Sequence, residues 1–158
     1  MLTCFSCAVD NLIEDEGWRQ MASEDVLRIL AHRAPFLFVE SVVELVPGER
    51  ATAKSHVPSV DLQALGAGLL PSVPLWYAVE FLAQTGALAV LSAASVGERT
   101  LMTGLDDFTL FEAGNVDEPL YAEVALLGER RGIGKRQGTV WQGTRKLAEG
   151  LVWYARVR

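Results

Sequence analysis

The stretch Pro74-Leu-Trp-Tyr-Ala-Val-Glu-Phe-Leu-Ala-Gln-Thr-Gly-Ala-Leu-Ala-Val-Leu-Ser-Ala-Ala94 decides the fold, and Glu80 is its one charged residue. A helix that is apolar on every side is buried. We therefore expect one long core helix from about Pro74 to Ser95, ended by Gly97. Burying an unpaired carboxylate is costly, and buried acids are what acid–base chemistry uses. Glu80 is thus the main catalytic candidate.

The same stretch is near the length of a membrane span. Glu80 and Gln84, however, lie close to its centre, where a charged residue costs about 2.5–3.5 kcal/mol. Its flanks also lack the basic residues that anchor a span. We predict a core helix and no membrane span.

Length and charge restrict the class of protein. The chain has 158 residues, half of them hydrophobic, which suits one domain with a sizeable core. Its formal net charge of -6 is opposite to the basic surface of a nucleic-acid binder. We expect a single domain at residues 21–158 after a poorly ordered leader at residues 1–20, and no nucleic-acid partner.

Cys4 and Cys7 form a C-x-x-C near the start of the chain. Such a pair can be a redox motif or half of a zinc site, but no second pair completes four-coordinate zinc and no βαβ pattern follows. We expect two thiols in a loose leader, as suits a reducing cytoplasm. No metal and no cofactor are expected.

The remaining pattern predicts one short helix and several antiparallel strands. Ser23 is typical of an N-cap, so a helix should run to about Leu30. Pro47-Gly48 predicts a hairpin turn, and Pro58–Val73 a loop. The expected strands are Phe36–Leu45, Glu49–Val57, Thr100–Phe111, Leu120–Leu127, Gly132–Gln142 and Ala148–Val157.

This order predicts an α+β fold in which an antiparallel sheet of about five to six strands wraps around one long central helix. One sheet can cover only part of an apolar helix. A dimer is the obvious way to bury the remainder.

Tyr77, Glu80 and Gln84 share one stripe of the helix. They predict an acid oriented by a neighbouring amide inside a substrate tunnel, although a satisfied internal hydrogen-bond group fits the same pattern. Free backbone N–H groups near Leu75 to Tyr77 could hold a thioester carbonyl. The two histidines, His32 and His56, are each more often structural than catalytic.

Arg130, Arg131, Lys135 and Arg136 gather near a strand turn of this acidic chain. They could dock an acidic partner such as acyl carrier protein. A solvated hairpin end explains them equally well.

Three motifs resemble the β-hydroxyacyl-acyl-carrier-protein dehydratases of fatty-acid synthesis, the FabZ/FabA hotdog group. Ile29-Leu-Ala-His-Arg-Ala-Pro-Phe-Leu-Phe-Val-Glu40 is similar to the family's L-P-H-R-x-P-F-L-L-V-D segment. Val79-Glu-Phe-Leu-Ala-Gln84 is similar to its E-A-M-A-Q, and Gly104-Leu-Asp-Asp-Phe108 to its G-I-D strand. The resemblance implies a hotdog fold and an acyl thioester carried by acyl carrier protein.

The chain departs from the family where the catalytic histidine is expected. The family's G-H-F-P-G-x-P motif falls on Leu65-Gly-Ala-Gly-Leu-Leu-Pro71, which puts Gly66 in place of the histidine. His56 lies ten residues earlier and is no simple replacement, so His32 is the better candidate. The P-x-W that starts at Pro74 resembles the ApeP-type dehydratase homologues of aryl-polyene clusters, which similarly lack the histidine motif.

We therefore expect a cytoplasmic (3R)-3-hydroxyacyl-acyl-carrier-protein dehydratase-like protein. It would act as a homodimer or as a heterodimer with a second hotdog protein. The resemblance implies Glu80 and His32 as catalytic residues. We expect the substrate-binding residues to be Trp76, Tyr77, Gln84 and Gly66. A non-catalytic subunit of a heterodimeric dehydratase, and an acyl thioesterase with Glu80 as base toward water, stay open.

Overall fold

The computed structural model describes residues 21–57, 59–66 and 72–158. The leader expected at residues 1–20, with Cys4 and Cys7, lies outside the described residues. So do residues 67–71 of the stretch that matches the family's histidine motif.

The centre of the molecule is the predicted apolar helix, α3, at Leu75–Leu91, with Pro74 at its N-cap. It ends earlier than the predicted Ser95. The Ser92 hydroxyl donates to Ala89 O at 3.1 Å, and Ala93 N–H donates back to Val90 O. These local bonds replace the next α-helical turn. In the described part of the chain, no helix is long and apolar enough to cross a membrane.

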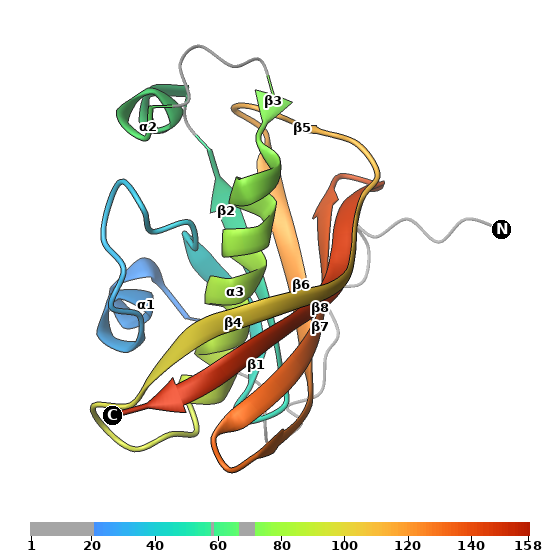
Figure 1. Cartoon of the computed structure of the whole chain (residues 1–158). Coiled ribbons are helices and arrows are strands. Elements are labelled where there is room, and N and C mark those ends of the chain that lie inside the picture. Colours follow the sequence, from blue (N-terminus) through green and yellow to red (C-terminus); the bar gives the residue numbers. More distant parts are fainter. Residues whose placement is uncertain (1–20, 58, 67–71) are drawn as a thin grey trace, which may run out of the picture.

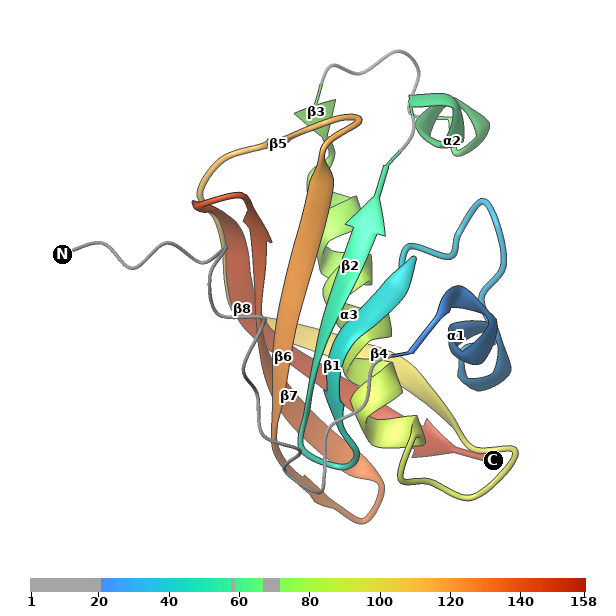
Figure 2. The same cartoon turned by 180° about the vertical axis from the view of Figure 1, so that it is seen from behind.

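An antiparallel sheet of six strands curls around α3, as the sequence predicts (Figures 1 and 2). The strand order is β1-β2-β6-β7-β8-β4, so β1 and β4 are its edges. The strands are β1 Ser41–Val46, β2 Arg50–His56, β4 Arg99–Leu110, β6 Pro119–Arg130, β7 Ile133–Gln142 and β8 Arg145–Val157.

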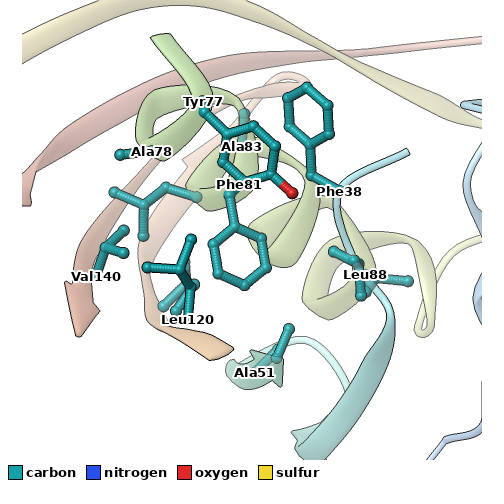
Figure 3. Packing of buried hydrophobic residues seen from close by; sticks show 14 of the residues in the cluster. Phe38, Ala51, Tyr77, Ala78, Phe81, Ala83, Leu88, Leu120 and Val140 are labelled. Carbon is teal, nitrogen blue, oxygen red and sulfur yellow. The ribbon is translucent and has the colours of Figure 1, made fainter. Parts of the chain in front are cut away.

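The core lies between α3 and the sheet, where α3 packs against β2, β6, β7 and β4. Figure 3 shows Phe81 and Leu88 of the helix among Leu120, Val140 and Ala51 of the strands. Phe81 and Leu88 have no exposed surface, and burial of each such side chain contributes about 1.5–3 kcal/mol. This packing fixes the rotation of α3 and therefore the direction in which Glu80 projects.

Two predicted boundaries near the N-terminal end of the described chain are wrong. The first strand begins at Ser41, not at Phe36, because backbone groups of Phe36 and Phe38 bond to a helix side chain instead of a strand. Ala22, not Ser23, is the N-cap of helix α1, Ser23–Ile29. The Ser23 hydroxyl instead donates to Glu40 O at 2.7 Å and ties α1 to the start of β1.

The loop predicted at Pro58–Val73 contains a short helix, α2, at Ser59–Ala64, and a two-residue strand, β3, at Ser72–Val73. β3 pairs with β5, Gly114–Asn115. Elements this short carry no periodicity. The Gln142 side chain holds β5 in place through two hydrogen bonds to the Asn115 backbone, at 2.7 and 3.0 Å. A partner 27 residues away leaves no local signal.

Candidate functional site

A cavity of about 280 Å³ lies between α1 with its following loop, α3 and the start of β4. Its volume is at the lower end for small-molecule sites. Apolar side chains form most of its wall, namely Ile29, Leu30, Ala83, Ala87, Leu91 and Leu101. Its polar side chains include His32, Glu80, Gln84, Arg99 and Arg136. A mainly apolar cavity with a few polar groups suits an acyl chain with one reacting end.

Glu80 and His32 meet in this cavity. Glu80 projects from α3, and His32 comes from the loop after α1. The distance from His32 Nε2 to Glu80 Oε1 is 3.5 Å. The Glu80 side chain is 17% exposed and that of His32 40% exposed, so a ligand can reach both. His32 Nδ1 is buried and bonds to none of the residues that the structure describes, whereas Nε2 is the ring nitrogen that lies near Glu80.

Gln84 connects Glu80 to the loop that carries His32. Its Oε1 accepts from Phe38 N–H at 2.8 Å, and its Nε2 donates to Phe36 O and to Glu80 Oε1, both at 2.9 Å. Both N–H donors and the carbonyl of the amide are therefore in use. Gln84 thus fixes the Glu80 carboxylate relative to the loop, and the backbone of Phe36 and Phe38 holds the Gln84 amide in turn.

The other predicted site residues do not line this cavity. Tyr77 is in the core, where its ring stacks on Phe38 with centroids 4.0 Å apart and its hydroxyl bonds to Ser55 Oγ at 2.7 Å. Its backbone N–H donates to Pro74 O, so this N–H expected to be free is in use. Trp76 is 39% exposed, and Gly66 is exposed in the turn after α2, with φ of 78°.

His56 was the less favoured of the two histidines as a catalytic candidate. It is exposed at the end of β2. It is not among the described residues that line the cavity. His32 is thus the histidine that the fold brings to Glu80. The roles of all these residues stay predictions.

Arg136 is the polar cavity residue that the sequence interpretation missed. The sequence allowed two interpretations of the basic cluster, a docking surface or a solvated hairpin end, and both place it on the surface. Both are wrong for Arg136, which is 1% exposed. Burial lowers its pKa to about 10. Its guanidinium lies over the Tyr154 ring, 4.8 Å from the centroid, and its Nε and Nη1 have no hydrogen-bond partner among the described residues.

A signal for this burial was present in the alternation of β7. Gly134, Arg136 and Gly138 are spaced by two, so they share one face of the strand. A side chain at Gly134 would overlap the Tyr154 ring, and one at Gly138 would overlap Leu82. Glycines on both sides of an arginine therefore indicated a crowded, inward face.

Within the described residues, no group of three or more His, Cys, Asp and Glu side chains is placed to hold a metal ion. The polar side chains among the described residues that line the cavity carry one carboxylate, one imidazole, one amide, one hydroxyl and two guanidinium groups. Such a set can exchange protons and bind oxygen atoms of a ligand.

A curled antiparallel sheet around one central helix, with a carboxylate facing an apolar cavity, defines a hotdog protein. No family model matches the chain. It is 35% identical over 137 residues to the 3-hydroxyacyl-[acyl-carrier-protein] dehydratase FabZ of Herpetosiphon aurantiacus, covering 84% of this chain and 95% of that protein. The Enterococcus faecalis FabZ is 36% identical over 131 residues, 79% of this chain and 90% of that one.

The chain therefore belongs to the FabZ family of 3-hydroxyacyl-acyl-carrier-protein dehydratases, as its motifs predict. Among solved structures, the dehydratase heterocomplex ApeI:P from Xenorhabdus doucetiae aligns with a TM-score of 0.70 and 19% identity, over 84% of this chain and 91% of that one. At this identity the likeness shows the fold, and it confirms the hotdog architecture.

Proposed function

We propose that this protein is a 3-hydroxyacyl-acyl-carrier-protein dehydratase whose reacting groups are Glu80 and His32. The observation that carries the proposal is the pairing of these two side chains, 3.5 Å apart, at an apolar cavity. Membership of the FabZ family supports the substrate class.

Dehydration of a 3-hydroxyacyl thioester breaks the α-carbon C–H bond and the β-carbon C–O bond, and it forms a C=C bond and water. One group must accept the α-proton and one must supply a proton to the leaving hydroxyl. Glu80 and His32 are close enough to share a proton and so to divide the two roles. Gln84 holds the carboxylate in place while charge develops.

A partner chain on the β4 edge supports this activity. β4 leaves its outer edge unpaired in the six-stranded sheet. It also exposes large apolar side chains, Leu101, Met102, Leu105 and Leu110, each 41–55% exposed. Exposed strand edges with apolar side chains are sites of association. We propose that residues 21–158 act as one domain that dimerises here, either with a second copy or with another hotdog chain.

The surface basic residues support delivery of the substrate by acyl carrier protein. Arg130 and Arg131 are exposed at the turn between β6 and β7. Lys135 lies on the opposite face of β7 from Arg136, 5.1 Å from the centre of the Trp153 ring. Since the chain carries a net charge of -6, this basic patch is a local exception that suits an acidic carrier.

A second candidate is a non-catalytic hotdog subunit, and Gly66 is the observation that favours it. Gly66 stands where the family carries its catalytic histidine, and it cannot transfer a proton. In this case the chain alone would be inactive, and a histidine-bearing partner would supply the missing group.

Turnover separates these possibilities. The purified full chain is mixed with a short 3-hydroxyacyl-acyl carrier protein, and the acyl group is followed by mass spectrometry for loss of one water. We expect the enoyl thioester to form with the chain alone. Release of free carrier-protein thiol would instead indicate a thioesterase. Activity only after co-expression with a histidine-bearing hotdog chain would favour the non-catalytic subunit.

A further inference from the structure

The Arg136 guanidinium is a buried cation, and two of its nitrogens lack a hydrogen-bond acceptor in the part of the chain that the structure describes. Its side chain is 1% exposed, yet Nε and Nη1 have no partner among the described residues. Buried polar groups are nearly always hydrogen-bonded, so each exception needs an explanation. Burial of an unpaired charge is also expensive. An acceptor from a bound ligand would remove both penalties.

The described residues around Arg136 leave its Nε and Nη1 without acceptors, although the charge of the Glu80 carboxylate partly offsets the effect of burial. Tyr154 covers the guanidinium with its ring face, while the tyrosine hydroxyl donates to Glu129 Oε2 at 3.0 Å. Burial and this hydrogen bond raise the pKa of Tyr154 to about 12, so the phenol stays uncharged at neutral pH. The Glu80 carboxylate faces the same cavity but makes its contacts with His32 and Gln84.

Glycines on α3 and β7 leave the space that the Arg136 side chain and its Tyr154 neighbour occupy. Gly86 of α3 faces it, and a Cβ there would overlap Arg136 Cδ and Nε. Gly134, two residues earlier on β7, leaves the space that the Tyr154 ring occupies. Two glycines thus make room for the stacked Arg136–Tyr154 pair inside the core, which is a built position and not a chance burial.

The charge around the cavity favours an anion. Of the described residues that line it, Arg99 and Arg136 are cations and Glu80 is the one carboxylate. The formal charges of these three residues leave one positive charge in excess, although the whole chain carries -6. A guanidinium offers parallel N–H donors that match a carboxylate.

We propose that Arg136 binds a carboxylate at the far end of a short acyl chain, so that the preferred ligands are ω-carboxyacyl thioesters. The cavity of about 280 Å³ suits a short chain, and its apolar wall would contact the methylene groups between the thioester and the carboxylate. The inference rests on the proposed function, because it takes the cavity as the acyl site. Arg136 would then determine specificity and take no part in the proton transfers.

The test compares two thioesters of N-acetylcysteamine that differ at one end. Glutaryl and pentanoyl thioesters have the same chain length, but the first ends in a carboxylate and the second in a methyl group. Neither has a 3-hydroxyl group, so neither can be dehydrated. Their affinities for the full chain are measured by calorimetry, and turnover of a 3-hydroxyacyl-acyl carrier protein is measured on the same preparation. A failure of the dehydratase proposal is thereby seen separately.

We expect the wild-type protein to bind the glutaryl thioester about tenfold tighter or more, as one charge-assisted hydrogen-bonded contact provides. Arg136→Met should bring the ratio near one and should leave the melting temperature unchanged or higher, because it removes an unpaired buried charge. Arg50→Met is the matched control at an exposed position of β2, away from the cavity lining, and should keep the wild-type ratio. Arg136→Gln is a second neutral variant with the same expected loss of preference.

Four results would overturn the inference. They are equal affinities for the two thioesters in the wild type, a preference that persists in Arg136→Met, and failure of both Arg136 variants to fold. The fourth is dissociation of a dimer by Arg136→Met without any carboxylate preference in the wild type. That result would assign the arginine to an interface between copies.

Discussion

Gln84 and Arg136 are two polar side chains that line one cavity, and their hydrogen bonding differs completely. Each is 1% exposed. Gln84 uses its whole amide in three hydrogen bonds, whereas Arg136 leaves Nε and Nη1 without a partner among the described residues. Two equally buried polar side chains therefore affect stability in opposite directions. The satisfied amide holds the structure together, and the unsatisfied cation is kept at a cost to stability.

The largest effect on stability is expected for Gln84→Leu. It leaves Phe38 N–H and Phe36 O without their partner, and each such group costs about 1–3 kcal/mol. The free energy of unfolding should fall by about 2–4 kcal/mol in urea denaturation. Gln137→Leu, at an exposed position of β7, should change it by about 0.5 kcal/mol or less. Equal effects of the two variants would mean that the Gln84 bonds do not hold the loop to α3.

Arg136→Met should have the opposite sign. Burial, only partly opposed by the charges of nearby groups such as Glu80, lowers the arginine pKa from 12.5 to about 10, which corresponds to a net cost of about 3 kcal/mol in the folded state. The contact with the Tyr154 ring offsets about 1–2 kcal/mol of this. The variant should therefore be more stable by about 1–2 kcal/mol, measured against Arg130→Met. A loss of stability would place Arg136 with Gln84 as a structural residue.

The smallest effect is expected for Gly86→Ala, which sharpens the comparison at the arginine. The added Cβ would overlap the Arg136 side chain, a strain of about 1–3 kcal/mol that the helix preference for alanine reduces by about 1 kcal/mol. A net loss of about 1 kcal/mol is expected in the wild type. In an Arg136→Ala background the same change should be neutral or stabilising. A double-mutant cycle that gives no coupling energy between Gly86→Ala and Arg136→Ala would show that the two residues are not in contact.

The sequence predicted the fold well where periodicity is long. The apolar run at Pro74–Ala94 and the alternation of the later strands give the central helix and its sheet with small boundary errors. Phe36–Glu40 looked like part of a strand because four of its five residues are apolar, but Phe36 and Phe38 bond to the side chain of Gln84 instead of a strand. The contact responsible spans 46 residues between Phe38 and Gln84, and no local pattern contains it.

The site was predictable in part for the same reason. A carboxylate in an apolar helix singled out Glu80 without reference to any neighbour, and the helical spacing gave Gln84 beside it. Tyr77 shares that spacing but turns into the core, because Ser55 and Phe38 receive it there. Arg136 was hidden by its basic neighbours in sequence. The flanking glycines were the one local sign that it faces inward.

The central claim is that Glu80 performs proton transfer in the cavity, and turnover by Glu80→Gln tests it most directly. The variant keeps the shape of the side chain and its contact with Gln84, so its melting temperature should stay close to that of the wild type. Rates of enoyl formation should fall by about 10²–10⁴-fold, while Glu123→Gln, exposed on β6, should keep the wild-type rate. Conversion by Glu80→Gln at the wild-type rate would contradict the claim.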